Sequence, residues 1–139
     1  MRRAANVKNF SVDFKVTDFK NVLGYPTDTN LRMTMLNDFD LTEVAIAEGM
    51  PPRIADNAQI PYFEYVLAKR KGTKLDSLFT TVYEPYKNER YIEGMKPVSV
   101  TAKEGESTDA VRAVKVVHTN GRVDYIVSVS YTHLLSGSY

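Results

Sequence analysis

The chain has 139 residues, the size of one folded domain, and 43% of them are hydrophobic while 25% are charged. This composition excludes a disordered or fibrous protein. Eighteen Lys and Arg residues against 17 Asp and Glu residues leave a formal net charge of +1, far from the basic excess of proteins that bind nucleic acid. The absence of cysteine excludes thiol nucleophiles and cysteine-bound metal.

The first predicted strand covers Phe10 to Val16, where hydrophobic and polar residues alternate. This alternation is typical of a strand with one face in water. A turn-rich segment follows between Phe19 and Asn30. Further strands are predicted where alternating, β-branched or aromatic residues lie between turn residues, at 31–35, 44–46, 62–68, 78–83 and 98–101. A helix is the alternative for residues 62–68.

The clearest prediction is a β-hairpin near the C-terminus. Val111 to Val117 and Val123 to Val129 are both β-branched runs, and Asn120-Gly121 lies between them. Asn-Gly at such a position is the strongest short-range signal for a hairpin turn. No segment shows the 3.6-residue repeat of a helix. About seven short strands joined by turns therefore predict an all-β antiparallel β-sandwich, as a single domain over residues 1–139.

Membrane and export signals are missing from the sequence pattern. No run approaches the roughly 20 apolar residues that span a bilayer, so we expect no membrane span. The basic start at Arg2 and Arg3 is followed by charged residues instead of an apolar segment, which predicts no signal peptide in this chain.

The two histidines, His118 and His133, are the only candidates for the usual general base. Neither lies in a recognisable catalytic or metal motif, and the chain has no acidic calcium loop and no glycine-rich phosphate loop. His118 enters the predicted hairpin turn, where we favour a structural role at the strand end. We assign no catalytic residue, no metal ligand and no cofactor to this chain.

A basic run and a tyrosine group are the candidate binding residues. Lys69, Arg70 and Lys71 lie beside a predicted turn and would contact the sulfates or carboxylates of an acidic glycan, with arginine making two-point contacts. Their alternative role is a solvated strand end. Tyr83 and Tyr86 would stack on sugar rings, and core packing is their alternative role.

Four blocks of sequence carry a resemblance to a known family. They are LRMTML at 31–36, AEGMPP at 47–52, YVLAKRKG at 65–72 and SLFTTVYEPY at 77–86. In letters, order and spacing they resemble the C-terminal part of bacterial heparinase II/III-like polysaccharide lyases. The resemblance extends from Val7 to Val127, and the last block is the most specific.

This resemblance implies a fold and an activity for a larger parent protein. Such enzymes join an N-terminal α/α toroid to C-terminal β-sandwich layers, and they cleave uronic-acid-containing polysaccharides by β-elimination in the periplasm or outside the cell. Their catalytic groups, and any divalent metal of the parent enzyme, lie mainly upstream of these four blocks. The chain is thus expected to be a fragment whose partner is the upstream catalytic domain of the same polypeptide.

Two hypotheses follow for the function. The first is an accessory, structural β-sandwich domain of such a lyase, inactive by itself. The alternative is a free-standing carbohydrate-binding module for acidic glycans that uses the basic run and exposed tyrosines. Separately, Ser130 to Leu134 resembles translated adapter sequence at the ends of assembled environmental sequences, so residues 130–139 are expected to be a frayed or non-native tail.

Overall fold

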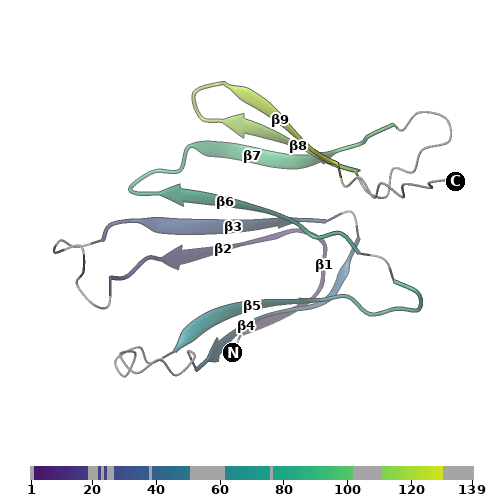
Figure 1. Cartoon of the computed structure of the whole chain (residues 1–139), viewed down its shortest axis with the longest axis horizontal. Coiled ribbons are helices and arrows are strands. Elements are labelled where there is room, and N and C mark those ends of the chain that lie inside the picture. Colours follow the sequence, from purple (N-terminus) through teal and green to yellow (C-terminus); the bar gives the residue numbers. More distant parts are fainter. Residues whose placement is uncertain are drawn as a thin grey trace, which may run out of the picture. The chain divides into compact units, whose positions relative to one another are not determined.

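Nine β strands make up the part of the chain that the structure describes (Figure 1). The structure is a computed structural model, and it describes residues 2–18, 22, 24, 27–37, 39–50, 62–75, 77–101 and 111–129. The strands are β1 (Arg2–Val7), β2 (Phe10–Lys15), β3 (Asn30–Leu36), β4 (Leu41–Gly49), β5 (Phe63–Lys69), β6 (Thr80–Tyr86), β7 (Ile92–Val98), β8 (Val111–His118) and β9 (Val123–Val129). Their pairs are antiparallel and no described residue is helical, so the predicted all-β class is confirmed.

The strands form three antiparallel sheets of three strands each, in the orders β1-β4-β5, β2-β3-β6 and β7-β8-β9. The first two sheets lie in one compact unit, Met1–Glu89, and the third lies in a second unit, Arg90–Tyr139. The division falls in the short polar turn between β6 and β7, where no linker composition marks it. The face-to-face packing of a sandwich stays a prediction.

In the first unit, the chain passes three times between the two sheets, and the first two crossings meet at one corner. β1 leads into β2 through Lys8 and Asn9, and β3 leads into β4 through residues 37–40. Asn37, with only 1% of its surface exposed, holds this corner. Its backbone N–H donates to Asn9 Oδ1 at 2.9 Å, and its Nδ2 donates to the Lys8 carbonyl at 3.1 Å. Asn37 therefore joins the segment between β3 and β4 to the segment between β1 and β2.

A hydrophobic cluster of the first unit gathers at the same corner. Met35 of β3 is buried together with Leu41 and Val44 of β4. Four partly buried side chains pack against these three: Val7, Phe10, Phe39 and Ala68. Because its members come from both sheets, burial of this cluster holds the two sheets of the unit together.

The β2-β3-β6 sheet carries a row of charged residues across its strands. In register, Asp13 lies opposite Arg32, and Arg32 lies opposite Glu84. Arg32 Nε donates to Asp13 Oδ1 at 2.7 Å and its Nη2 pairs with Oδ2, while the Tyr86 hydroxyl donates to Asp13 Oδ1 at 3.0 Å. The hydrogen bond with Asp13, followed by lesser charge interactions, raises the pKa of Arg32 above its ordinary value. We call these four residues the cross-strand network.

The second unit is a meander of three strands around the predicted hairpin. β8 pairs with β9 from Val111↔Val129 to Val117↔Val123, and Gly121 in the turn has a φ of 85°, which glycine adopts without strain. The pairing of β7 with β8 shifts register between Ile92 and Gly94, the mark of a β-bulge. The buried hydrophobic residues of this unit are Ile92, Ala113, Val114 and Val116. The hairpin is confirmed.

Several strand predictions need correction. About seven strands were expected, but nine are described, and β1 has no counterpart in the prediction. The strand expected to end before Glu84 runs on to Tyr86 as β6, because Pro85 is tolerated in an outer strand. A strand was expected at 98–101, but the strand in this region is β7, which covers Ile92–Val98 and ends where the predicted strand was to begin. β5 confirms a strand, not a helix.

Some predictions fall on residues outside the described ranges. These are the Pro51-Pro52 closure, the polar loop at 103–109, His133 and the tail at 130–139. Within the described ranges, no helix has the length and apolar character needed to cross a membrane.

Candidate functional site

The basic run predicted to bind glycan lies at the end of β5. Lys69 is the last residue of the strand and is exposed, as is Lys71, whose backbone N–H donates to Thr42 Oγ1 at 2.9 Å. Arg70 differs from both lysines. Its guanidinium carbon lies 4.1 Å from the centre of the Phe39 ring, and its Nη1 donates to Ser77 Oγ at 2.9 Å. Arg70 is therefore occupied by packing within the first unit.

The two predicted tyrosines lie in β6 but on different faces of its sheet. Three positions separate Tyr83 from Tyr86, and side chains alternate along a strand. Tyr83 is 59% exposed, whereas Tyr86 is half-buried and its hydroxyl bonds to Asp13. The basic run belongs to the β1-β4-β5 sheet and the tyrosines to the β2-β3-β6 sheet, so the five predicted binding residues are divided between two sheets.

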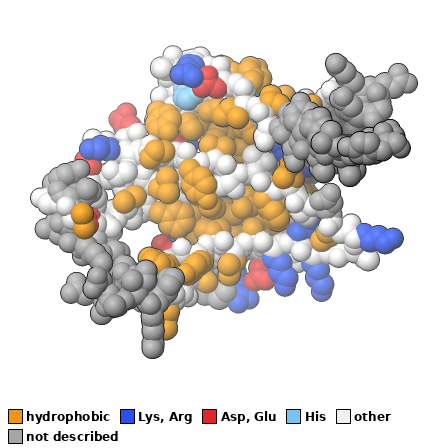
Figure 2. Space-filling view, viewed as in Figure 1, with side chains coloured by type: hydrophobic (Ala, Val, Ile, Leu, Met, Phe, Trp, Pro, Cys, Tyr) orange, Lys and Arg blue, Asp and Glu red, His pale blue; other side chains and the backbone are white. Residues whose placement is uncertain are grey.

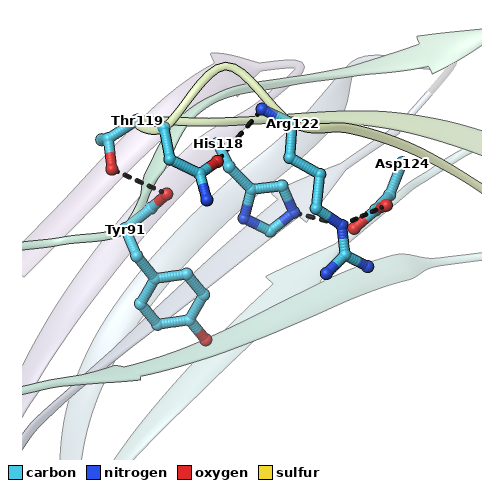
Figure 3. A network of polar contacts seen from close by, with 6 residues as sticks. Tyr91, His118, Thr119, Arg122 and Asp124 are labelled. Carbon is cyan, nitrogen blue, oxygen red and sulfur yellow. Dashed lines mark hydrogen bonds and ion pairs between the residues drawn. The ribbon is translucent and has the colours of Figure 1, made fainter.

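The histidine of the hairpin belongs to a polar cluster in the second unit (Figure 3). His118 Nε2 donates to Asp124 Oδ2 at 2.8 Å, and Arg122 Nε donates to Asp124 Oδ1, also at 2.8 Å. The Tyr91 ring stacks on the His118 ring, with centroids 6.2 Å apart and planes 12° from parallel. Thr119 N–H donates to the Tyr91 carbonyl at 2.9 Å. We call these residues the hairpin cluster.

The electrostatics of the hairpin cluster centre on Asp124. Its hydrogen bond with Arg122, and then that with His118, lower the pKa of Asp124 below its ordinary value of 3.8. His118 ends β8 and Arg122 immediately precedes β9, so the Asp124 carboxylate links the two ends of the turn between these strands. This arrangement fits the structural role expected for His118.

The first unit has a groove with a volume of about 670 Å³. It lies between the end of β2 and the start of β5, which are outer strands of their sheets. Its lining residues are Phe14, Lys15, Thr17, Tyr62, Phe63, Glu64 and Tyr65. Hydrophobic side chains reach the surface over the strands of this unit (Figure 2). We call this site the aromatic groove.

One lining ring is positioned by a glycine. Gly49 lies opposite Phe63 in register, and a Cβ built on Gly49 would lie 2.6 Å from Cε2 of Tyr65. The Tyr65 ring thus covers the backbone of β4 at a place that only glycine leaves open. Residues 62–68 were predicted as a strand and not as a site. The signal that could have marked the site is the presence of three aromatic residues within four positions at a strand start.

No metal centre is formed by the described residues. No group of three or more His, Asp or Glu side chains among them is arranged to hold a metal ion. Comparisons of the chain with protein-family models, with curated proteins and with solved structures find no match.

Proposed function

We propose that this chain is an accessory β domain of a heparinase II/III-like polysaccharide lyase, an enzyme class that cleaves uronic-acid-containing polysaccharides by β-elimination. The catalytic groups would lie outside this chain, in an upstream domain of the same polypeptide. The role proposed here is structural: the domain supports the catalytic part and forms one wall of the glycan cleft.

One observation carries this proposal. The four blocks that resemble the family fall on strands of the first unit, because they contain most of β3, the end of β4, most of β5 and the whole of β6. Residues in strands determine how the strands pack and pair. A resemblance located in strands is therefore what a domain with a structural role requires. The corner at Asn37 and the network around Arg32 lie in or beside these blocks.

A second function, a free-standing carbohydrate-binding module, is favoured by a different observation. The aromatic groove offers exposed rings at a strand start, and aromatic side chains with polar neighbours are a common lining of ligand sites. In this alternative the chain would bind an acidic glycan without an upstream enzyme.

The DNA upstream of the Met1 codon tests the first proposal against the second. An open frame that continues into an α/α toroid is the expected result. A stop codon followed by a ribosome-binding site would overturn the accessory-domain proposal in favour of the module.

A separate assay tests whether the chain is inactive by itself. Incubation of the chain with heparin and alginate is followed by ultraviolet absorbance of the unsaturated uronide product. We expect no rate above that of buffer, and a reproducible rate would show that catalytic groups lie within these 139 residues.

A further inference from the structure

We propose that the aromatic groove is a subsite that binds a uronic-acid-containing sugar chain by stacking on Phe63 and Tyr65, which share one face of β5, and by pairing its carboxylate with Lys15. The chemical class of this ligand rests on the proposed function, whereas the location of the subsite rests on the structure alone. Neither the basic run nor Tyr83 and Tyr86 contribute to it.

The first argument is the exposure of the rings. Tyr62, Phe63 and Tyr65 are 45%, 40% and 41% exposed, although they lie within four positions of one another and line a concave surface. Half-exposed rings lose contact with water when a flat apolar surface covers them, which is favourable. The faces of pyranose rings are such surfaces, and their hydroxyl groups remain free at the rim.

The second argument is that the polar groups of the groove have no partners in the described part of the chain. The hydroxyls of Tyr62 and Tyr65, the Lys15 ammonium and the Glu64 carboxylate form no hydrogen bond or ion pair there. In contrast, the Tyr86 hydroxyl already donates to Asp13. Polar groups beside apolar rings and left without protein partners are what a hydroxyl-rich ligand requires.

The third argument is charge. Lys15 supplies the only cation among the described lining residues and would pair with a uronate carboxylate, while Glu64 would accept hydrogen bonds from sugar hydroxyls. A volume of about 670 Å³ is within the usual range for a bound small molecule and is too small for a folded protein partner. An oligosaccharide is therefore a better fit than a protein surface.

Gly49 is a positioning residue in this proposal. Because an added Cβ would meet the Tyr65 ring at 2.6 Å, any side chain at position 49 would push the ring away from its place in the groove. Gly49 does not line the groove itself, so its replacement changes ring placement without removing a lining side chain.

The test is a titration of the full, ¹⁵N-labelled chain with alginate tetrasaccharide and, separately, with a neutral gluco-tetrasaccharide, followed by NMR. We expect saturable shifts at the groove residues, with tighter binding of the acidic ligand at low salt. Phe63→Ala and Tyr65→Ala should each weaken binding by about tenfold. Gly49→Ala should weaken it by about threefold through displacement of the Tyr65 ring.

Matched variants separate stacking from charge and from loss of folding. Tyr65→Phe keeps the ring and should retain most of the affinity, whereas Tyr83→Ala removes an exposed tyrosine outside the groove and should change nothing. Lys15→Gln should weaken uronate binding by about threefold and leave neutral binding unchanged. A thermal melt of each variant verifies that it is folded.

Three results would overturn the inference. One is glycan binding that is unchanged in both Phe63→Ala and Tyr65→Ala; it would place the glycan elsewhere and leave the accessory-domain proposal standing. Another is the absence of saturable shifts with either tetrasaccharide. The third is groove shifts with an extended peptide but not with sugars, which would make the groove a peptide site. The upstream gene decides the accessory-domain proposal independently of all three.

Discussion

The aromatic groove and the cross-strand network share strand β2, yet only the network's polar side chains are bonded to protein partners among the described residues. Asp13 and Lys15 are two positions apart in β2. Asp13 accepts from both Arg32 and Tyr86, whereas Lys15 lines the groove without a described ion-pair partner. Both regions contain tyrosines and charges of both signs. Availability for a ligand is therefore decided by the partners that the fold supplies, and not by residue type.

Removal of Arg32 should produce the largest effect. Arg32→Met takes away the paired hydrogen bonds to Asp13 and the cation opposite Glu84, which is fully buried. We expect a loss of about 2 kcal/mol in the free energy of unfolding, measured by urea denaturation. Lys15→Met, on the neighbouring strand, is the control and should change it by less than about 0.5 kcal/mol. Equal losses would remove the distinction between network and groove.

Replacement of Arg70 extends the comparison to the basic run. Arg70→Ala removes the contact with the Phe39 ring and the hydrogen bond to Ser77. We expect a loss of about 1.5 kcal/mol in the free energy of unfolding, while Lys69→Ala should have almost no effect. If the two variants unfold at the same urea concentration, Arg70 is a surface cation after all.

A pair of hydroxyl deletions gives the sharpest matched comparison. Tyr86→Phe removes the donor to Asp13 and should lower the free energy of unfolding by about 1 kcal/mol. Tyr65→Phe removes a hydroxyl that has no partner in the described residues and should leave stability unchanged. Both are read from chemical denaturation. Destabilisation by Tyr65→Phe would mean that the Tyr65 hydroxyl stabilises the fold and is not available to a ligand.

The smallest effect is expected from the hairpin cluster, and it depends on pH. Because the folded-state pKa of Asp124 lies below its ordinary value of 3.8, its stabilising contribution is present above that pH and is lost as pH falls through the folded-state value. Asp124→Asn should therefore lower Tm slightly at pH 7 and have no effect in strong acid. Melts across this range test it, with the exposed Asp40→Asn as control.

Local sequence was sufficient for strands that carry their own pattern. Alternation marked β2 and β3, and Asn120-Gly121 marked the β8–β9 hairpin, because period and turn chemistry act over a few residues. β1 was missed since its residues show no alternation. It is a strand because it pairs with β4, from Arg2↔Ile46 to Val7↔Leu41, and that pairing joins positions far apart in sequence.

The candidate site could be predicted less well than the fold. The sequence marked Lys69 to Lys71 and two tyrosines by type, but the tertiary structure occupies Arg70 and Tyr86 with protein partners. The sequence also predicted a strand at residues 62–68, but it did not indicate which residues lie opposite the start of that strand. The end of β2 forms the opposite wall of the groove, and β2 and β5 belong to different sheets.

The sequence by itself determined the all-β class, most strand positions and the hairpin turn, because backbone preference and hydrophobic period are local properties. Only the tertiary structure decided the corner at Asn37, the three sheets and which polar side chains keep unused hydrogen-bonding groups. These depend on contacts between residues distant along the chain, and such contacts follow from the packing of whole strands.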